Sequence, residues 1–168
     1  MTDRRLAGPG FPGDTGEPDP ALRAALTAYA ASPARYADAL AVLAGGRLLV
    51  PVVAVLGEVE VDEAGLAHDK TSDMAAVMLE GADGRVAMLA FTGTDSLTAW
   101  DPEARPVPVT SAMAAQAALQ EGAAALVVDV AGPVSFVVEG DDLSGVAAQW
   151  ALTTVAGRSA WLRPAEDS

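Results

Sequence analysis

The chain has 168 residues, of which 51% are hydrophobic and 20% are charged, and its formal net charge is −13. This composition excludes a wholly disordered chain, because enough apolar surface is available to offset the entropy cost of folding. The negative charge also argues against two classes of partner, nucleic acid and the anionic face of a membrane.

The sequence lacks several features of metal-binding, membrane-spanning and secreted proteins. The chain has no cysteine, which excludes disulfides, thiolate catalysis and the usual zinc or iron–sulfur ligands. Its longest apolar run, Leu48 to Leu56, is much shorter than the roughly 20 residues that span a bilayer. The N-terminal sequence MTDRRLAGPGFPGD lacks the apolar run of a secretory signal. We therefore expect a cytoplasmic protein that binds no cofactor and no metal.

The first third of the chain predicts an arm and two helices. Residues 1–18 are rich in Gly, Pro and acidic side chains, which predicts a flexible arm without regular backbone partners. Asp19 followed by Pro20 is typical of a helix start. Pro33 marks a second helix start, and that helix ends at Gly45. Two antiparallel helices are expected.

A run of β-branched residues follows. Residues 47–56, RLLVPVVAVL, are apolar on both faces and predict an internal strand. Pro51 cannot donate to a strand ladder, so we expect a bulge or an unpaired side there. After a polar stretch over residues 57–73, two apolar runs flank GADG and predict a hairpin over residues 74–91.

The second half of the chain alternates helices and strands. FTGTDSLTAW predicts a short helix capped by Thr94 or Asp95, and ARPVPV predicts an extended segment. An alanine-rich helix over residues 110–121 precedes a second hairpin, and a last helix is expected to be capped by Asp141 or Asp142. The predicted order is ααβββαβαββα, an α+β fold in which two N-terminal helices and further helices pack on a mixed β-sheet.

Three strings in this order resemble a known family. LLVPVVAV, AMLAFTGTDSLTAW and AALVVDVAGPVSFVV are similar to the N-terminal domain of the SseB family, named after an enhanced serine sensitivity protein, and the likeness covers residues 20–152. The resemblance implies a standalone SseB-like domain over residues 19–152 and a C-terminal tail over residues 153–168. It supplies no established catalytic residues. Many members have an Asn-Pro turn where this chain has DVAGP.

The stretch HDKTSDM holds the only histidine and the only lysine of the chain. Three interpretations of this stretch are open. It is a recognition loop in which Lys70 supplies a positive charge and Arg105 a second one, or it is a solvated loop whose polar side chains bond to the local backbone. The third interpretation is the nucleophilic site of a small hydrolase that uses Ser72, Lys70 and His68. The candidate binding residues are His68, Asp69, Lys70, Ser72, Asp73 and Arg105.

Other polar strings favour structural roles. FTGTDS lacks the glycine pattern of a phosphate-binding loop, and EGDDLSG lacks the spacing of a calcium loop, so both indicate helix starts. The sequence favours a non-enzymatic binding or regulatory module whose partner is an unknown protein or a small acidic ligand. A homo-oligomeric assembly protein is the third alternative, besides the hydrolase.

Overall fold

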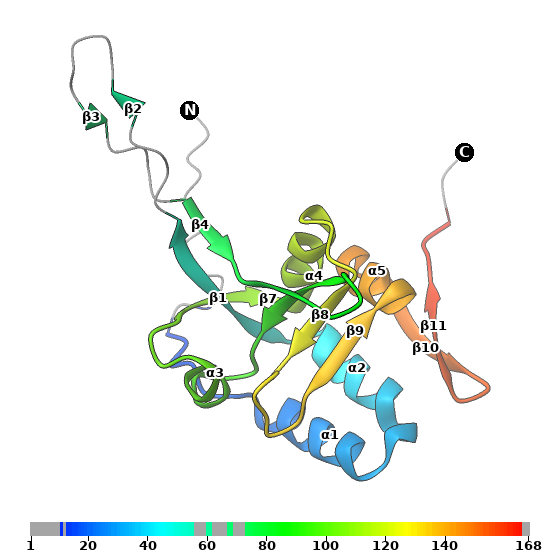
Figure 1. The fold of residues 1–168 in the computed structure, drawn as a ribbon. Helices are drawn as coiled ribbons and strands as arrows, with labels where there is room; N and C mark the ends of the chain where they lie inside the picture. The colour runs from blue at the N-terminus through cyan, green and yellow to red at the C-terminus, as the bar shows by residue number, and fades with distance from the viewer. Residues whose placement is uncertain (1–10, 12, 56–59, 62–66, 69–72, 166–168) are drawn as a thin grey trace.

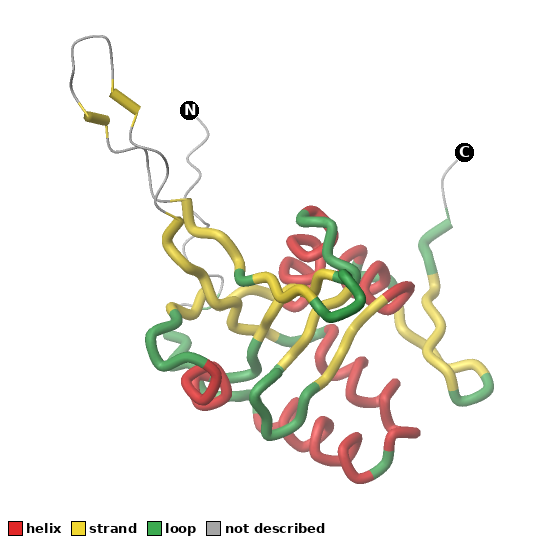
Figure 2. The backbone as a smooth tube through the Cα atoms, viewed as in Figure 1, coloured by secondary structure: helices red, strands yellow, loops and turns green. Residues whose placement is uncertain are grey.

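The computed structural model describes residues 11, 13–55, 60, 61, 67, 68 and 73–165. It shows an α+β fold with mixed strands, which confirms the predicted class and the order of its main elements. Most of the helices cover one side of the strands, the short helix over residues 94–100 lies on the other side, and a C-terminal hairpin extends beyond them (Figures 1 and 2).

Two helices open the domain as predicted. Helix α1 (Pro20–Ala31) begins after Asp19, whose carboxylate accepts a hydrogen bond from the Ala21 N–H. A short 3₁₀ turn, η1 (Pro33–Arg35), separates it from helix α2 (Tyr36–Ala44). Each helix turns a leucine face inward, because apolar residues recur at helical spacing. The buried leucines are Leu22, Leu26, Leu40 and Leu43.

A three-stranded antiparallel sheet follows the order β4-β1-β7. Its central strand is β1 (Arg47–Val55), with β4 (Asp73–Ala76) on one side and β7 (Arg105–Thr110) on the other. A two-stranded ribbon of β2 (Glu60–Val61) and β3 (Ala67–His68) lies between β1 and β4 in the chain. The prediction of an internal strand over residues 47–56 is confirmed.

Prolines determine which sides of these strands can pair. Leu49 exchanges hydrogen bonds of 2.7 and 2.8 Å with Phe91, so its N–H points away from β7. Because successive backbone groups alternate along a strand, Pro51 also has its nitrogen on the side away from β7. On the side of β1 that faces away from β7, Leu49 bonds to Phe91 and the pairing with β4 begins at Val52. Pro51 lies between these two contacts, so its missing N–H leaves no ladder bond unmade. Pro106 lies opposite Pro51 on β7.

The second sheet has four strands in the order β5-β6-β8-β9. Strands β6 (Val86–Ala90) and β8 (Ala125–Val128) run parallel, while β5 (Met78–Glu80) and β9 (Phe136–Glu139) are antiparallel to their neighbours. The predicted hairpin over residues 74–91 is therefore partly confirmed, because only the second half of its first strand pairs with its second strand. Residues before Val77 pair with β1, and residues after it pair with β6.

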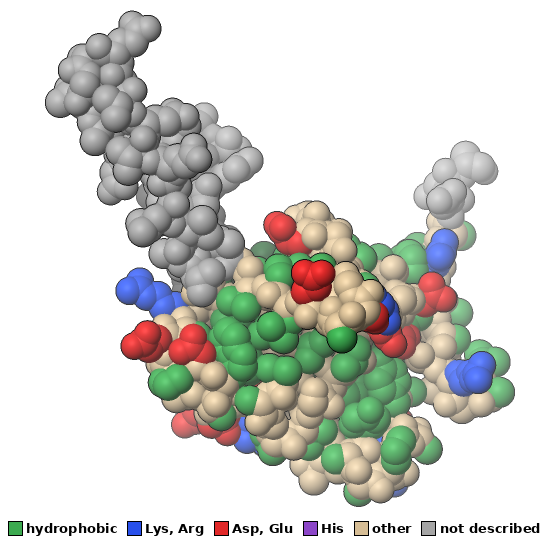
Figure 3. All heavy atoms as spheres, viewed as in Figure 1, with side chains coloured by type: hydrophobic (Ala, Val, Ile, Leu, Met, Phe, Trp, Pro, Cys, Tyr) green, Lys and Arg blue, Asp and Glu red, His purple; other side chains and the backbone are tan. Residues whose placement is uncertain are grey.

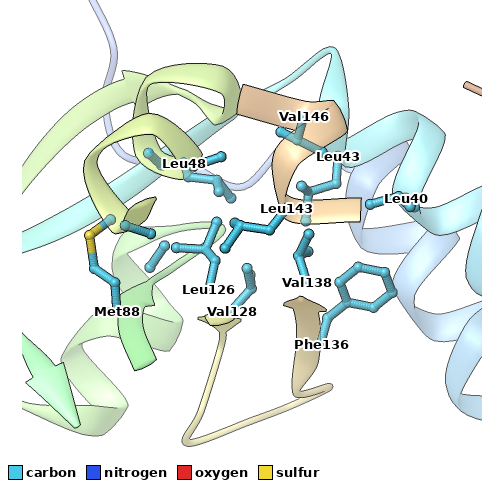
Figure 4. Close-up of a cluster of buried hydrophobic side chains, with 14 of the residues drawn as sticks. Leu40, Leu43, Leu48, Met88, Leu126, Val128, Phe136, Val138, Leu143 and Val146 are labelled. Carbon is cyan, nitrogen blue, oxygen red and sulfur yellow. The ribbon is translucent and has the colours of Figure 1, made fainter. Parts of the chain in front are cut away.

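Four helices and the strand faces that they cover form the main core. Helices α4 (Ser111–Gln120) and α5 (Gly140–Ala148) pack on each other and join α1 and α2 over one face of the strands. Figure 4 shows the side chains that meet there, among them Leu48, Leu126 and Val138. The other face carries a smaller cluster under helix α3 (Thr94–Trp100), made of Leu49, Leu89, Phe91 and Leu97.

The predicted helix caps need correction. Helix α3 has Gly93 at its N-cap, in place of Thr94 or Asp95. The Asp95 side chain is bound to Arg23, which occupies the carboxylate that a cap would use. Helix α5 has Glu139 at its N-cap with no side-chain bond. The Asp142 carboxylate instead accepts hydrogen bonds from Ser159 and Trp161.

Two described segments, residues 13–18 and 151–162, have more regular partners than the sequence predicts. Residues 153–168 were expected to form a tail, but β10 (Ala151–Val155) and β11 (Arg158–Leu162) form an antiparallel hairpin. Residues 1–18 were expected to lack regular partners, but residues 13–18 bond to the start of β1 and to the residues after β6. Long-range contacts, which periodicity does not report, hold residues 13–18, whereas the hairpin pairs residues that are close in sequence, across a turn at Ala156 and Gly157.

Candidate functional site

A polar cluster lies where the parallel strands β6 and β8 end. The ladder between them continues one residue further, because the Asp129 N–H donates to the Ala90 carbonyl at 3.0 Å. Asp129 then turns into the left-handed region with φ 54°. Its carboxylate accepts from the Thr92 N–H at 2.8 Å and from the Thr92 hydroxyl at 2.6 Å. In sheets with parallel strands, ligands bind preferentially at this carboxyl end.

Thr92 connects this carboxylate to two arginines. Its carbonyl accepts from Arg47 Nη1 at 2.9 Å, and its hydroxyl oxygen accepts from Arg23 Nη2 at 3.3 Å. Thr92 is 1% exposed and Asp129 is 1% exposed. The cluster is therefore a closed hydrogen-bond network in which every polar group of Thr92 has a protein partner.

Burial raises the pKa of the Asp129 carboxyl, and the two hydrogen bonds from Thr92 oppose this rise. At the rim of the cluster the balance is reversed. Hydrogen bonding to Arg23 lowers the pKa of Asp95, and the same contact raises the pKa of Arg23. The pKa values of the two carboxyls are thus shifted in opposite directions, although both groups belong to one network.

Residues 13–18 cover the cluster from outside. Asp14 places both carboxylate oxygens on Arg47, at 3.0 Å from Nη2 and 2.7 Å from Nε. The second contact is a charge contact, since Asp14 Oδ2 is buried and makes no aligned hydrogen bond. The Glu17 carbonyl accepts from Arg47 Nη2 at 2.6 Å, and the Gly16 carbonyl accepts from the Thr94 N–H at 2.7 Å.

The second feature of functional interest is the uncovered part of the four-stranded sheet, on the face opposite the main core. It forms an open hollow of about 330 Å³ beside Leu79, Ala87, Ala125 and Val127. Hydrophobic side chains gather over the middle of this face (Figure 3). We call this surface the open face. Its charged rim consists of Glu80, Asp83, Arg85 and Glu139.

The structure places only part of the site predicted from the sequence. Asp69, Lys70 and Ser72 lie outside the described residues. His68 lies in β3 opposite Glu60. Asp73 starts β4 opposite Val55, and Arg105 starts β7 opposite Val52. With about 4.8 Å between strands and 3.3 Å per residue, the Cα atoms of Asp73 and Arg105 are about 14 Å apart, so the structure does not bring these two together.

Sequence reasoning missed the residues of the polar cluster. Arg23, Arg47 and Asp129 carry no motif, and Asp129 lies in a string interpreted as a hairpin turn. One signal was available. Strands over residues 86–90 and 125–128, separated by helical patterns, are consistent with parallel neighbours, and polar residues directly after such strands meet at one edge.

Two further findings concern metals and membranes. Among the described residues, no group of three or more His, Asp or Glu side chains is placed to hold a metal ion. Over the same part of the chain, no helix is both long and apolar enough to cross a bilayer. The expected absence of a metal and of a cofactor stays a prediction.

Comparison with known families gives one match. A family model described as the SseB protein N-terminal domain matches residues 22–144, which include the polar cluster and the open face. Neither the curated proteins nor the solved structures contain a match. The match confirms the resemblance found in the sequence, and because it spans more than half of the 168 residues, the chain belongs to the SseB family.

Proposed function

We propose that this chain is a non-catalytic, cytoplasmic binding module of SseB type that holds a partner protein on the open face. The observation that carries the proposal is the exposure of apolar side chains on this face. Val137 is 39% exposed and Leu79 is 40% exposed, whereas Phe136 and Val138, which neighbour Val137 on β9, are 0% exposed.

Strand composition explains why this exposure is informative. A sheet with one solvated face normally alternates apolar and polar residues. Strands β6 and β8 read VAMLA and ALVV, so they are apolar on both faces. Helix α3 covers Leu89 and Phe91, but the hollow beside Ala87 and Val127 stays open. Apolar patches of this kind on soluble proteins mark interaction surfaces.

The rim determines the chemistry of the partner. Three of its four charged side chains are acidic, and the remaining one, Arg85, is paired with Glu139 at 3.1 Å. The whole chain carries a net charge of −13. A partner with apolar side chains at its centre and Lys or Arg at its border would be complementary to this surface.

The polar cluster supports binding rather than catalysis. A hydroxyl nucleophile needs a free oxygen and a base within hydrogen-bond reach. The Thr92 hydroxyl donates to Asp129, and the Ser96 hydroxyl, 2% exposed, donates to the Gly93 carbonyl at 3.0 Å. Both hydroxyls are used to hold the turn after β6.

The stretch HDKTSDM, together with Arg105, is a second part of the proposal. Lys70 and Arg105 would attract an acidic group of a partner or a small ligand, because a nearby charge outweighs distant charges beyond a Debye length of about 8 to 10 Å. Asp69, Ser72 and Asp73 would orient that group. On this proposal Lys70→Ala weakens binding and leaves the fold unchanged, since a lysine that reaches a partner through solvent would contribute little to stability.

Site-specific photo-crosslinking tests the open face. A photoreactive amino acid at Leu79 should give one discrete crosslinked product in the native cell, and Val137→Asp in the same chain should abolish it. The matched control is the same probe at Val155, which is also exposed but lies on the C-terminal hairpin.

Two outcomes would contradict the proposal. Equal products from positions 79 and 155 would show that capture is unspecific. A product of twice the mass of the chain would identify a second copy as the occupant, and would favour an assembly protein over a module that binds other proteins.

A further inference from the structure

Residues 13–18 lie against the start of β1 and the start of α3, and we call the surface that they cover there the cleft. They form neither helix nor strand, and they attach through one carboxylate and two backbone carbonyls. The partners are Arg47 and the Thr94 N–H, which both belong to the domain matched by the family model.

Arg47 is built to bind an acidic segment. Its side chain is 14% exposed, and its guanidinium donates to Thr92 within the domain and to Asp14 and Glu17 in the segment. Without the segment, the guanidinium would keep only the Thr92 carbonyl among these acceptors. Any segment that covers Arg47 must supply a counter-charge, because burying an unpaired charge is costly, and a planar guanidinium pairs with a carboxylate through two hydrogen bonds. The vacant cleft would therefore favour a carboxylate ligand.

The cleft also selects a backbone shape. Gly16 has φ +80°, and a Cβ at this position would collide with the Thr94 side chain. Gly93 faces the segment from the other side, where a Cβ would lie 2.8 Å from Pro18 Cδ. The close approach of these two backbones thus depends on a glycine on each side.

We infer that the cleft formed by Arg47, Gly93 and Thr94 is a binding site for an acidic peptide of the form Asp-x-Gly-Glu-Pro that bends at its glycine, and that residues 13–18 occupy it as a built-in competitor. This site is separate from the open face and does not depend on its function. The ligand is a segment of a partner protein with an aspartate that replaces Asp14 on Arg47.

The nature of the contacts makes exchange possible. The segment is held by ionic and backbone hydrogen bonds, and a competing peptide of the same type restores each of them. Attachment to α1 gives the resident segment an effective concentration in the millimolar range. A free peptide therefore competes poorly with the wild-type chain, and weakening the resident segment opens the site.

The test uses the full chain and a fluorescent peptide with the sequence of residues 11–20, FPGDTGEPDP. Gly16→Val in the protein displaces the resident segment, and fluorescence anisotropy should then show saturable binding that is at least about tenfold tighter than to the wild type. A peptide with Asp14→Asn, or Arg47→Lys in the Gly16→Val protein, should weaken this binding by about tenfold or more, because each removes a charged, two-pronged contact.

Gly84→Val is the matched control for backbone strain. Gly84 also has a positive φ, +81°, but it lies in the turn between β5 and β6, where a Cβ would have no neighbour within 4 Å. This variant should bind the peptide no better than the wild type. Asp14→Asn in the full chain is a second way to weaken the resident segment, and near-UV circular dichroism checks that each variant is folded.

The inference is overturned if a folded Gly16→Val or Asp14→Asn chain fails to bind the peptide. It is also overturned if the Asp14→Asn peptide binds as tightly as the unchanged one, since binding would then not involve Arg47. Loss of folding in both variants would show that residues 13–18 are a structural part of the domain and not an exchangeable ligand.

Discussion

The segment 13–18 and the hairpin β10–β11 both lie outside the residues 22–144 of the family match, but they attach to the domain by different chemistry. The N-terminal segment is held by an ion pair whose side chains are 14% and 9% exposed. The hairpin is held mainly by Trp161, whose ring lies against Gly145 and whose Nε1 donates to Asp142 at 2.9 Å.

The two attachments also differ in what they pack against. Gly145 has no side chain, and any Cβ there would collide with the Trp161 ring, so the hairpin depends on close packing of one indole. Open hollows of about 450 and 360 Å³ flank this contact. The N-terminal segment instead closes over the polar cluster. The N-terminal segment thus completes a buried network, while the C-terminal hairpin rests on the domain through Trp161, with smaller contacts from Leu152 and Ser159.

Arg47→Ala should have the largest effect, because it leaves the buried Asp14 carboxylate without its counter-charge. Removing one partner of a buried ion pair costs about 3 kcal/mol or more of unfolding free energy, measured by urea denaturation. Arg35→Ala is the control, since Arg35 is 61% exposed and 3.9 Å from Asp38, and it should change stability by less than about 0.5 kcal/mol. Equal effects would mean that the buried contact contributes no more than a surface pair.

Trp161→Ala should cost less, about 1 to 2 kcal/mol, because the ring is only half-buried. The loss should be local. An isolated two-stranded hairpin is marginally stable in water, so amide exchange should speed up over residues 151–162 and stay unchanged in β6 and β8. Faster exchange throughout the sheet would show instead that the hairpin stabilises the whole domain.

Asp129→Asn should have the smallest effect, and it tests the polar cluster alone. Since the pKa of Asp129 is raised on folding, its contribution to stability is present below the ordinary carboxyl pKa of about 4 and is lost as pH rises through the folded value. Asparagine tolerates the left-handed backbone and does not titrate. Melting temperatures at pH 5 and pH 8 should therefore differ less in the variant than in the wild type.

Asp95 supplies the internal comparison for that experiment. Arg23 lowers its pKa, so its contribution is present above the ordinary carboxyl pKa and is lost as pH falls through the folded value. In Asp129→Asn only this acid-side loss should remain. A variant whose melting temperature still falls between pH 5 and pH 8 as in the wild type would show that another group causes the change.

Local patterns predicted most of the elements but not how the ends attach. Leucines at helical spacing predicted α1 and α2, and β-branched runs predicted β1, β8 and β9. The ion pair between Asp14 and Arg47 spans 33 residues, and the bond between Thr92 and Asp129 spans 37. Such pairs leave no period in the sequence. For the same reason, the sequence pointed to the contiguous polar stretch HDKTSDM as the candidate site. The polar cluster around Thr92 and Asp129 was missed, because its residues come from separate elements.

The prolines of β7 affect how copies of the chain can associate. Within the described strands, β7 is an edge of its sheet, and Pro108 lies opposite Leu49 just as Pro106 lies opposite Pro51. Since Leu49 directs its N–H away from β7, the nitrogens of both prolines face the free edge. An added strand from a second molecule would find two successive donors missing, and prolines at such edges protect proteins against aggregation. The free edge of β7 is thereby protected by the prolines of the strand itself.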